Sequence, residues 1–349
     1  MKTFQVKGEN RLSSIHVGER LENLKNYLPG TQVVIITDVN IKKEYGDIFP
    51  DVPVITIGTG EKIKTLETVE SILKQLIDLS CDRSSFIVGI GGGIVCDITG
   101  FAASIFMRGV KFGFVSTSLL SQVDASVGGK NGVNLASFKN MVGVFNQPEF
   151  VICDIHLLKT LPKEEISNGL AEIVKHALIK DAAMFDFIEQ NRENALHLDY
   201  DTIFKLVADS VDIKSRVVQQ DEKEAGERRK LNFGHTIGHA IEKIERTHTS
   251  KDYGHGRAVS MGMIAAALFS REKGLLAQKD TLRISCLLKD LNLPTELDYK
   301  ARDIISAAGK DKKKQGADLF YVFLESIGKA RVEKISFNQM NDFIQTIFK

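Results

Sequence analysis

Two of the eight histidines stand four residues apart in the segment Leu231–Glu242. On a helix, the rings of His235 and His239 share a face, where imidazoles can bind a metal ion or transfer protons. Gly234 and Gly238 directly precede the histidines, and their lack of a side chain predicts room for a metal, a cofactor or a substrate beside each ring. The alternative interpretation is a pair of interior histidines whose hydrogen bonds are satisfied within the protein.

A carboxylate, Glu172, stands on an otherwise apolar helical stretch, with Lys175 and His176 one turn further on. Such a carboxylate either pairs with its own lysine, which is the default interpretation, or binds a metal. Another imidazole, His255, lies between two glycines, and Glu172, His235 and His255 would make an open three-ligand site of the zinc type. Spacing by itself favours His235 with His239 as the ligand pair, so both sets of ligands stay open.

Anion binding is indicated by the glycine-rich turn Gly89–Asp97, which follows an expected strand and precedes an expected helix. Consecutive glycines let backbone N–H groups approach a pyrophosphate at a helix N-terminus, where the helix dipole favours an anion. The spacing is not GxGxxG, and an ordinary turn is the alternative. Asp38 and Asn40 close an earlier strand, where an acidic side chain of a nucleotide-binding fold accepts ribose hydroxyls, although both residue types also simply end strands.

Basic side chains offer phosphate contacts at further places. Lys130 and Lys139 stand in glycine-rich or polar surroundings, where an ammonium and backbone groups can bind an anion together. The clusters Arg228–Lys230 and Lys310–Lys314 add more cations. Exposed loop lysines and solvated charged faces are the competing interpretation for all of these positions.

The elements that must position these residues fall into two regions. Up to about residue 160, the β-branched runs Val33–Thr37, Val54–Ile57 and Phe86–Ile90 alternate with helical stretches such as Thr65–Leu79, as in a buried parallel sheet. After Pro162, one run looks like a strand, Leu319–Leu324, and the other periodic segments read as helices, at Glu164–Lys180, Thr202–Gln220, Leu231–Glu245, Gly256–Lys273 and Leu282–Leu291. We predict an α/β domain over residues 1–162, an all-α domain over 163–349 and a cleft between them.

Composition excludes several classes of partner. The 349 residues are 43% hydrophobic, and 46 Lys and Arg nearly cancel 45 Asp and Glu, so neither nucleic acid nor an anionic membrane is an expected partner. The four cysteines form no CxxC pair, which argues against a disulfide framework and a zinc knuckle. The start lacks an apolar signal core, and the longest apolar run, near Met261–Phe269, is too short to span a bilayer. A cytoplasmic protein is expected.

Together these motifs make the sequence resemble the 3-dehydroquinate synthase family of sugar phosphate cyclases, which acts in the shikimate pathway of chorismate and aromatic amino acid biosynthesis. Eight ordered matches cover nearly the whole chain: Gly60–Lys64, the glycine turn through Asp97, Phe106–Gly109, Ser118–Asp124, Gly128–Lys130, Lys139–Gly143, Ala171–His176 and Leu231–Glu242.

The chain departs from the family pattern at three places. Arg257 stands where the family usually has glutamate, Ser116–Leu120 lacks the usual proline, and Asn131 replaces threonine. Arg257 puts a cation beside His255, where it can weaken metal binding or alter the surroundings of the ligand.

The resemblance implies a nucleotide-binding, Rossmann-like α/β domain followed by a helical domain, in a homodimer. It implies a divalent metal, zinc or cobalt, on Glu172, His235 and His255. NAD would be bound by Asp38, Asn40, Glu61, Lys64, Gly92, Gly93, Asp97, Thr117, Ser118, Lys130, Lys139 and Thr160. The substrate would be bound by Arg108, Asp124, Lys130, Asn140, Lys175, Lys214, Arg228, Asn232, His239 and Lys312, with Arg108 reaching a phosphate in the partner subunit. Catalysis would fall to His239, Lys130, Lys175, Asn232 and Asp124.

The implied reaction converts a phosphorylated sugar acid, 3-deoxy-D-arabino-heptulosonate 7-phosphate, to 3-dehydroquinate and phosphate. NAD takes a hydride from C5, phosphate is eliminated, the hydride returns, and an aldol step closes the carbocycle, so NAD is regenerated. His239 would relay a proton near the metal. The alternatives are another sugar phosphate cyclase, a metal-dependent polyol dehydrogenase, and a metal-poor relative retained for binding.

Overall fold

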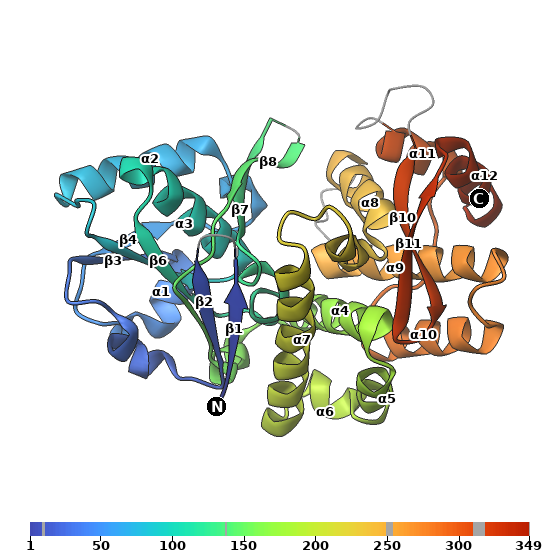
Figure 1. Cartoon of the computed structure of the whole chain (residues 1–349), viewed down its shortest axis with the longest axis horizontal. Helices are drawn as coiled ribbons and strands as arrows, with labels where there is room; N and C mark the ends of the chain where they lie inside the picture. The colour runs from blue at the N-terminus through green and yellow to red at the C-terminus, as the bar shows by residue number, and fades with distance from the viewer. Residues whose placement is uncertain (9–10, 137, 249–253, 310–317, 349) are drawn as a thin grey trace. The chain divides into compact units, whose positions relative to one another are not determined.

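The computed structural model describes residues 1–349 apart from 9–10, 137, 249–253, 310–317 and 349. Its chain divides into two compact units. The first consists of Met1–Pro162 and Ile203–Glu222, and the second of Lys163–Thr202 and Lys223–Lys349. Figure 1 colours the chain in order from blue to red, so that the elements of each unit can be followed by their labels.

The predicted division after residue 162 differs from these units in one segment. Ile203–Glu222 includes most of α7 (Tyr200–Gln220) and belongs to the first unit, although it falls inside the predicted second domain. The side chain of Gln219 shows why, because its amide donates a hydrogen bond of 3.0 Å to the carbonyl oxygen of Gln5 in the first strand. Helical periodicity predicts this helix but does not tell which layer it packs against.

A seven-stranded sheet forms the centre of the first unit, in the order β1-β2-β9-β6-β5-β3-β4. β1 and β2 are antiparallel, and every other neighbouring pair in the sheet is parallel. The strands are β1 (Lys2–Lys7), β2 (Leu12–Val17), β3 (Val33–Asp38), β4 (Val54–Ile57), β5 (Phe86–Gly91), β6 (Lys111–Ser116) and β9 (Phe150–Cys153). The same unit holds α1 (Val39–Tyr45), α2 (Leu66–Asp78), α3 (Gly93–Ile105) and a separate hairpin of β7 (Lys130–Leu135) and β8 (Phe138–Phe145).

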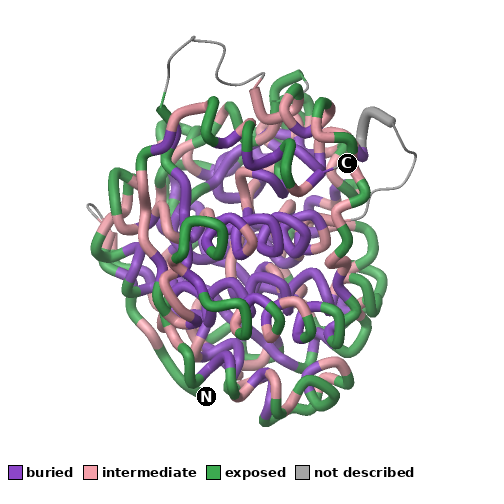
Figure 2. The backbone as a smooth tube through the Cα atoms, turned by 90° about the vertical axis from the view of Figure 1, so that its right-hand side faces the viewer, coloured by how far each residue is buried: buried purple, intermediate pink, exposed green. Residues whose placement is uncertain are grey.

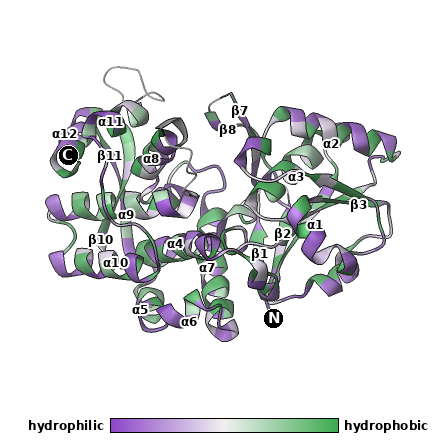
Figure 3. Ribbon diagram, turned by 180° about the vertical axis from the view of Figure 1, so that it is seen from behind, coloured by the Kyte–Doolittle hydropathy of each residue, from purple (hydrophilic) through white to green (hydrophobic). Residues whose placement is uncertain are grey.

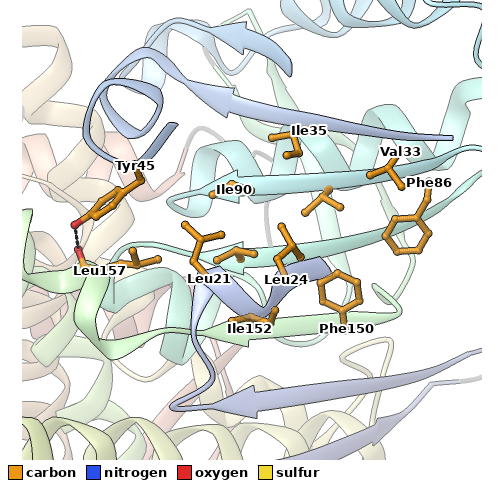
Figure 4. Packing of buried hydrophobic residues seen from close by; sticks show 12 residues of the cluster. Leu21, Leu24, Val33, Ile35, Tyr45, Phe86, Ile90, Phe150, Ile152 and Leu157 are labelled. Carbon is orange, nitrogen blue, oxygen red and sulfur yellow. Dashed lines mark hydrogen bonds between the residues drawn. The ribbon is translucent and has the colours of Figure 1, made fainter. Parts of the chain in front are cut away.

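Both faces of the central strands are buried, which explains their continuously apolar sequences. All of β5 is buried, as is all of β3 except its last residue. On one face, residues of β3, β5, β6 and β9 form a hydrophobic cluster with Leu21 and Leu24, where the rings of Phe86 and Phe150 stack 5.8 Å apart (Figure 4). The predicted buried parallel sheet is confirmed.

The helix α2 shows how local sequence sets an element. The hydroxyl of Thr65 accepts a hydrogen bond of 3.3 Å from the backbone N–H of Thr68, as an N-cap should. Val69, Ile72 and Leu76 are buried on one face. Figure 3 shows hydrophobic and hydrophilic segments alternating along α2, and Figure 2 shows buried residues on the interior segments of the chain. The helix predicted from this periodicity is confirmed.

The second unit is mainly helical, as predicted, but it also contains a two-stranded hairpin. The strand β10 (Leu319–Ser326) was expected, whereas its partner β11 (Lys329–Ile335) was not, because the charged side chains of β11 hide its alternation. The all-α prediction for this unit is therefore corrected by one hairpin. The helices are α4 (Lys163–Lys180), α5 (Ala182–Gln190), α6 (Arg192–Leu196), α8 (His235–His248), α9 (His255–Glu272), α10 (Gln278–Asp290), α11 (Ala301–Gly309) and α12 (Phe337–Ile347).

Two predictions made from the composition, on membrane spans and on cysteines, can be compared with the structure. Among the described residues, no helix combines the length and the apolar character that crossing a membrane requires. The four cysteines are free thiols, and Cys81, Cys96 and Cys153 are buried. Burial raises the pKa of all three buried thiols, so they behave as core residues rather than nucleophiles.

Candidate active site

The predicted nucleotide residues of the first unit lie at the carboxyl edge of its sheet. Asp38 ends β3, the glycine turn follows β5, Thr117 follows β6, and Thr160 comes shortly after β9. The strand β4 lies on one side of β3 and β5 on the other, so the direction of strand addition reverses between β3 and β5. Open α/β sheets bind their ligands at such a switch point. Asp38 and the glycine turn flank it.

The glycine turn leads directly into α3. Gly92 caps this helix, and Gly93 is its first residue. The backbone N–H of Thr117 donates a hydrogen bond of 3.0 Å to the carbonyl oxygen of Gly91, which places the end of β6 against the turn. A Cβ added to Gly92 would lie 3.3 Å from the hydroxyl oxygen of Ser118 and would occupy the space between them. An open turn at a helix N-terminus fits a nucleotide phosphate.

Asp38 and Thr160 each make contacts that the sequence does not reveal. One oxygen of Asp38 accepts hydrogen bonds from the backbone N–H groups of Asn40 (2.9 Å) and Ile41 (3.1 Å), so Asp38 also caps α1. Burial raises the pKa of this carboxyl. The hydroxyl of Thr160 lies 2.8 Å from that of Tyr45. Tyr45 was missed because a tyrosine ending a helix carries no signal of a binding site.

Four predicted residues meet in one polar network of the first unit. The ammonium of Lys64 pairs with Asp97 and donates a hydrogen bond of 2.6 Å to the side-chain oxygen of Asn140. Burial raises the pKa of Asp97, although the charge of Lys64 opposes that rise. Glu61 joins through the side chain of Asn134, which donates a hydrogen bond of 2.8 Å to its carboxylate. Asn134 was not predicted.

A second pair of predicted residues lies elsewhere in the first unit. The ammonium of Lys214, on α7, donates hydrogen bonds of 2.6 Å to both the carboxylate and the backbone carbonyl of Asp124. Lys130 and Lys139 lie on β7 and β8 rather than on loops, with Lys130 exposed. Arg108 is exposed, and its φ of 70° places it in the left-handed region.

The predicted metal ligands of the second unit converge. Glu172 on α4 is fully buried, and its Oε1 lies 3.7 Å from Nε2 of His235 and 3.4 Å from Nε2 of His255. One potential ligand atom from each residue falls within 4.8 Å of the others. A second group consists of His239, Glu242 and His255. Among the described residues, neither group contains the His235–His239 pair that spacing favours.

Hydrogen bonds hold both imidazoles so that Nε2 faces Glu172. Nδ1 of His235 lies 3.1 Å from the carbonyl oxygen of Phe233, and Nδ1 of His255 lies 3.1 Å from Oε1 of Glu242. Metal-binding histidines typically use one ring nitrogen for the metal and the other for such an acceptor. Glu242 was missed, because a glutamate late in an apolar helical motif looks like a solvated residue.

The charges around Glu172 suit a divalent cation. Burial alone would raise the pKa of Glu172, but the charge of Lys175 and contact with the two histidines hold it well below its usual value. Burial, aided by the charge of Lys175, lowers the pKa of His235 to about 3. Burial would also lower the pKa of His255, but its contacts with Glu172 and Glu242 raise it to about 9. An ionised carboxylate and a neutral imidazole are the forms that bind metal, so Glu172 and His235 are in their binding forms at neutral pH, whereas His255 must lose a proton first.

Close helix packing brings these residues together. A Cβ on Gly256 would lie 2.3 Å from the carbonyl oxygen of Asn168, so only glycine lets the start of α9 rest on α4, one turn before Glu172. The side-chain oxygen of Asn168 accepts a hydrogen bond of 3.1 Å from the backbone N–H of Arg257. Asn168 was also missed by sequence reasoning. The prediction that Arg257 affects the metal ligands stays a prediction.

The role predicted for Gly234, which precedes α8, and for Gly238, within α8, is wrong. A Cβ on Gly234 would lie 2.8 Å from the backbone nitrogen of Met263, and one on Gly238 would lie 3.1 Å from the carbonyl oxygen of Ala258. Both glycines therefore face the backbone of α9. They allow two helices to pack closely rather than leaving room for a ligand beside the rings.

The remaining predicted residues of the second unit differ in burial. Lys175 and Arg228 are buried, and the ammonium of Lys175 pairs with Glu172, so the default pairing and the cluster of ligands occur together. The side chain of Asn232 donates a hydrogen bond to Glu224, and His239 is exposed. Lys312, with the cluster Lys310–Lys314, lies outside the described residues.

Comparison with known sequences identifies relatives over nearly the full length. The family model described as 3-dehydroquinate synthase N-terminal matches residues 54–168, and the one described as 3-dehydroquinate synthase C-terminal matches residues 169–314. The 3-dehydroquinate synthase of Alkaliphilus metalliredigens is 38% identical over 341 residues, covering 95% of both chains. That of Desulforamulus reducens is 39% identical over 349 residues, covering 96% of both chains.

Solved structures share the fold. A 2-deoxy-scyllo-inosose synthase complexed with carbaglucose-6-phosphate, NAD+ and Co2+ has a TM-score of 0.82 at 26% identity, covering 99% of this chain and 100% of that one. A 2-epi-5-epi-valiolone synthase from Streptomyces hygroscopicus with NAD+ and Zn2+ bound has a TM-score of 0.86 at 23% identity, covering 99% of both. A probable glycerol dehydrogenase from Sinorhizobium meliloti has a TM-score of 0.68 at 14% identity, covering 95% of both.

Proposed function

The chain belongs to the 3-dehydroquinate synthase family, and we propose that it converts 3-deoxy-D-arabino-heptulosonate 7-phosphate to 3-dehydroquinate and phosphate with NAD and a divalent metal. The observation that carries this proposal is the convergence of Glu172, His235 and His255, three residues far apart in the sequence, on one group of possible ligand atoms.

The residues of the first unit would bind NAD, which accepts a hydride from the substrate and returns it. Gly92 and the N-terminus of α3 fit its pyrophosphate, and Asp38 stands at the end of β3 where a ribose would lie. Lys64 is held between Asp97 and Asn140, so its ammonium has a fixed place beside the proposed nucleotide. Lys214 is fixed in the same way by Asp124 and offers charge to a phosphate.

The residues of the second unit would hold the metal, zinc or cobalt, whose chemistry is to lower the pKa of a bound alcohol. Three ligands of the kind found here leave further coordination positions for substrate oxygens. Lys175 contributes a buried positive charge that can stabilise a departing phosphate. His239 is exposed one turn after His235, within the same helix face, and would move a proton to or from a substrate hydroxyl.

The test is a phosphate-release assay with the heptulosonate phosphate, run with and without NAD and a chelator. We expect phosphate release that needs both NAD and the metal, with no net accumulation of NADH, because the hydride is returned. The substitution Glu172→Gln should lower both the bound metal and phosphate release. Phosphate release without NAD, or with the metal removed, would refute the proposal.

A second candidate is a different cyclization, favoured by the likeness to the 2-deoxy-scyllo-inosose synthase complex. It predicts phosphate release from a hexose phosphate or another heptulose phosphate, and none from the heptulosonate phosphate. A polyol dehydrogenase would instead accumulate NADH with a simple polyol, and a metal-poor relative would retain no metal after purification. Three measurements on one preparation separate these four candidate functions. They are phosphate release from each sugar phosphate, NADH absorbance with a polyol, and metal content.

We also propose a homodimer in which Arg108 of each chain serves the site of the other. The exposure of Arg108 supports this, because an exposed guanidinium is accessible to a neighbouring chain. Arg108→Ala and Lys175→Met should each be inactive alone. Mixed after unfolding and refolding together, they should regain activity, whereas a residue that acts within its own chain would give no recovery.

A further inference from the structure

Asn134 makes three hydrogen bonds within the polar network of the first unit. Its side-chain oxygen accepts a hydrogen bond of 2.9 Å from the backbone N–H of Asn140, and its side-chain amide donates one of 2.8 Å to Oε1 of Glu61. Its own backbone N–H donates one of 2.9 Å to the carbonyl oxygen of Lys64. The three partners are residues that the family resemblance assigns to NAD (Glu61 and Lys64) or to the substrate (Asn140).

The orientation of the Asn134 amide follows from its partners. The backbone N–H of Asn140 can only donate and therefore needs the amide oxygen. The carboxylate of Glu61 accepts and therefore faces the amide nitrogen. An asparagine meets both requirements in this place, because it carries a donor and an acceptor on one short, planar group.

The contacts close into a ring. Asn134 donates to the backbone of Lys64, the ammonium of Lys64 donates to the side chain of Asn140, and the backbone of Asn140 donates to Asn134. Asn140 has a φ of 53°, in the left-handed region that asparagine tolerates better than most residues. The ring holds its backbone and its side chain in that conformation.

We infer that Asn134 is a positioning residue, which fixes the segment Glu61–Lys64 and the start of β8, with Lys139 and Asn140, against each other so that the residues proposed for NAD are held in place. The inference rests on the proposed function, since it concerns the NAD site of that same reaction. Asn134 itself need not contact the cofactor. Its loss should raise the dissociation constant of NAD more than it affects folding.

The test measures NAD binding by calorimetry in the full-length protein. Asn134→Asp keeps the size and the acceptor for Asn140 but places a second carboxylate beside Glu61. We expect the dissociation constant of NAD to rise about ten-fold or more, as expected when a hydrogen bond to a charged group is lost. Asn134→Ala, which adds no charge, should raise it by about three- to ten-fold.

A matched control comes from the other end of the same hairpin. Asn146 follows β8, and its amide donates a hydrogen bond of 2.8 Å to the hydroxyl of Ser104, away from the three partners of Asn134. Asn146→Ala removes a hydrogen bond of the same kind and should leave NAD affinity within about two-fold of the wild type.

A charge swap provides the sharpest test. In the double variant Glu61→Gln with Asn134→Asp, the new amide can donate to the new carboxylate, which restores the hydrogen bond with its direction reversed. NAD affinity of the double variant should then match that of Glu61→Gln alone within about three-fold, although the Asn134→Asp single variant binds NAD weakly. The comparison with the Glu61→Gln single variant removes any direct effect of Glu61 on NAD.

The outcomes separate the two levels of the argument. If the wild type binds NAD and Asn134→Asp binds it equally well, the inference is overturned and the proposed function stands. Equal loss of melting temperature in the Asn134 and Asn146 variants, with unchanged NAD affinity, also overturns it, because that is the behaviour of a purely structural residue. A wild type that does not bind NAD overturns both. If Asn134→Asp does not fold, the alanine variant and the charge swap decide in the same way.

Discussion

Replacing Glu242 with glutamine should weaken metal binding in a way that depends on pH. Glutamine has the same size, so the packing of α8 is kept, but the negative charge 3.1 Å from Nδ1 of His255 is lost. Replacing a carboxylate that supports a ligand histidine costs about ten- to a hundred-fold in metal affinity. That range corresponds to about 1.4–2.7 kcal/mol.

A second effect of the substitution acts in the opposite direction at neutral pH, because protonation of His255 competes with metal binding. The pKa of His255 is about 9, so at pH 7 about one molecule in a hundred has the neutral ring that a metal requires. Metal must displace that proton, which costs about 3 kcal/mol at pH 7 and nothing well above pH 9. Glu242→Gln lowers the pKa of His255 and reduces the cost. The two effects therefore oppose each other at pH 7, and the loss of affinity appears in full above pH 9.

The assay is competition for Co2+ between the protein and a chromophoric chelator, from pH 7 to pH 9.5. Wild-type affinity should rise with pH, and the ratio of the two dissociation constants, variant over wild type, should grow across this range. Glu245→Gln is the control, because Glu245 lies on the same helix, is equally buried at 8% exposure and contacts Tyr299 instead of a ligand. A ratio that shrinks with pH, or a control that behaves like Glu242→Gln, would refute the reasoning.

Three further outcomes are expected. Gly256→Ala forces a Cβ to within 2.3 Å of the backbone of Asn168 and should lower the free energy of unfolding by about 3 kcal/mol. Thermal denaturation in the presence of chelator measures this loss. Gly30→Ala, with open space around it, is the control and should be nearly neutral. Chelator should abolish phosphate release, and Co2+ or Zn2+ should restore it, while NAD affinity changes by less than about two-fold because the proposed NAD residues belong to the other unit. Tyr45→Phe removes the hydroxyl that contacts Thr160 and should raise the dissociation constant of NAD by about two- to five-fold in a binding titration; no change would remove Thr160 from the proposed site.

The central sheet was predictable because the hydrophobic pattern of each strand lies within a short segment of sequence. Strands covered on both faces must be apolar throughout. The sequence shows this pattern directly in the runs Val33–Thr37 and Phe86–Ile90. The hairpin β7–β8 was not recognised, since much of β8 is exposed and its sequence mixes charged, polar and apolar residues. The strand β11 was hidden by charge in the same way.

The proposed metal ligands could not be predicted from spacing within one segment. Spacing of four residues singled out His235 and His239, yet the structure groups His235 with Glu172 and His255, which come from other helices. Their approach depends on Gly256 meeting the backbone of Asn168, a contact between positions 88 residues apart. No periodicity encodes such a contact. The resemblance to a family predicted Glu172, His235 and His255 as ligands, whereas the spacing within the motif favoured His235 with His239.

The supporting residues were missed for a related reason. Asn134, Asn168 and Glu242 are common residue types in unremarkable settings, and each matters through the atom at the far end of its hydrogen bond. The sequence shows which hydrogen-bonding group each side chain carries, but it does not show which residue that group bonds to. Asn134 bridges two predicted site residues, Glu61 and Asn140, and this connection exists only in three dimensions.

The discontinuity of the first unit has a consequence for synthesis on the ribosome. The chain leaves that unit after Pro162, returns at Ile203 and leaves again after Glu222. A nascent chain therefore cannot complete its nucleotide-binding half until the returning helix has emerged from the exit tunnel, by which time Lys163–Thr202 of the other half is already outside. The two halves must mature in an overlapping order, and an expression fragment that stops at residue 162 would lack α7, most of which belongs to the same unit.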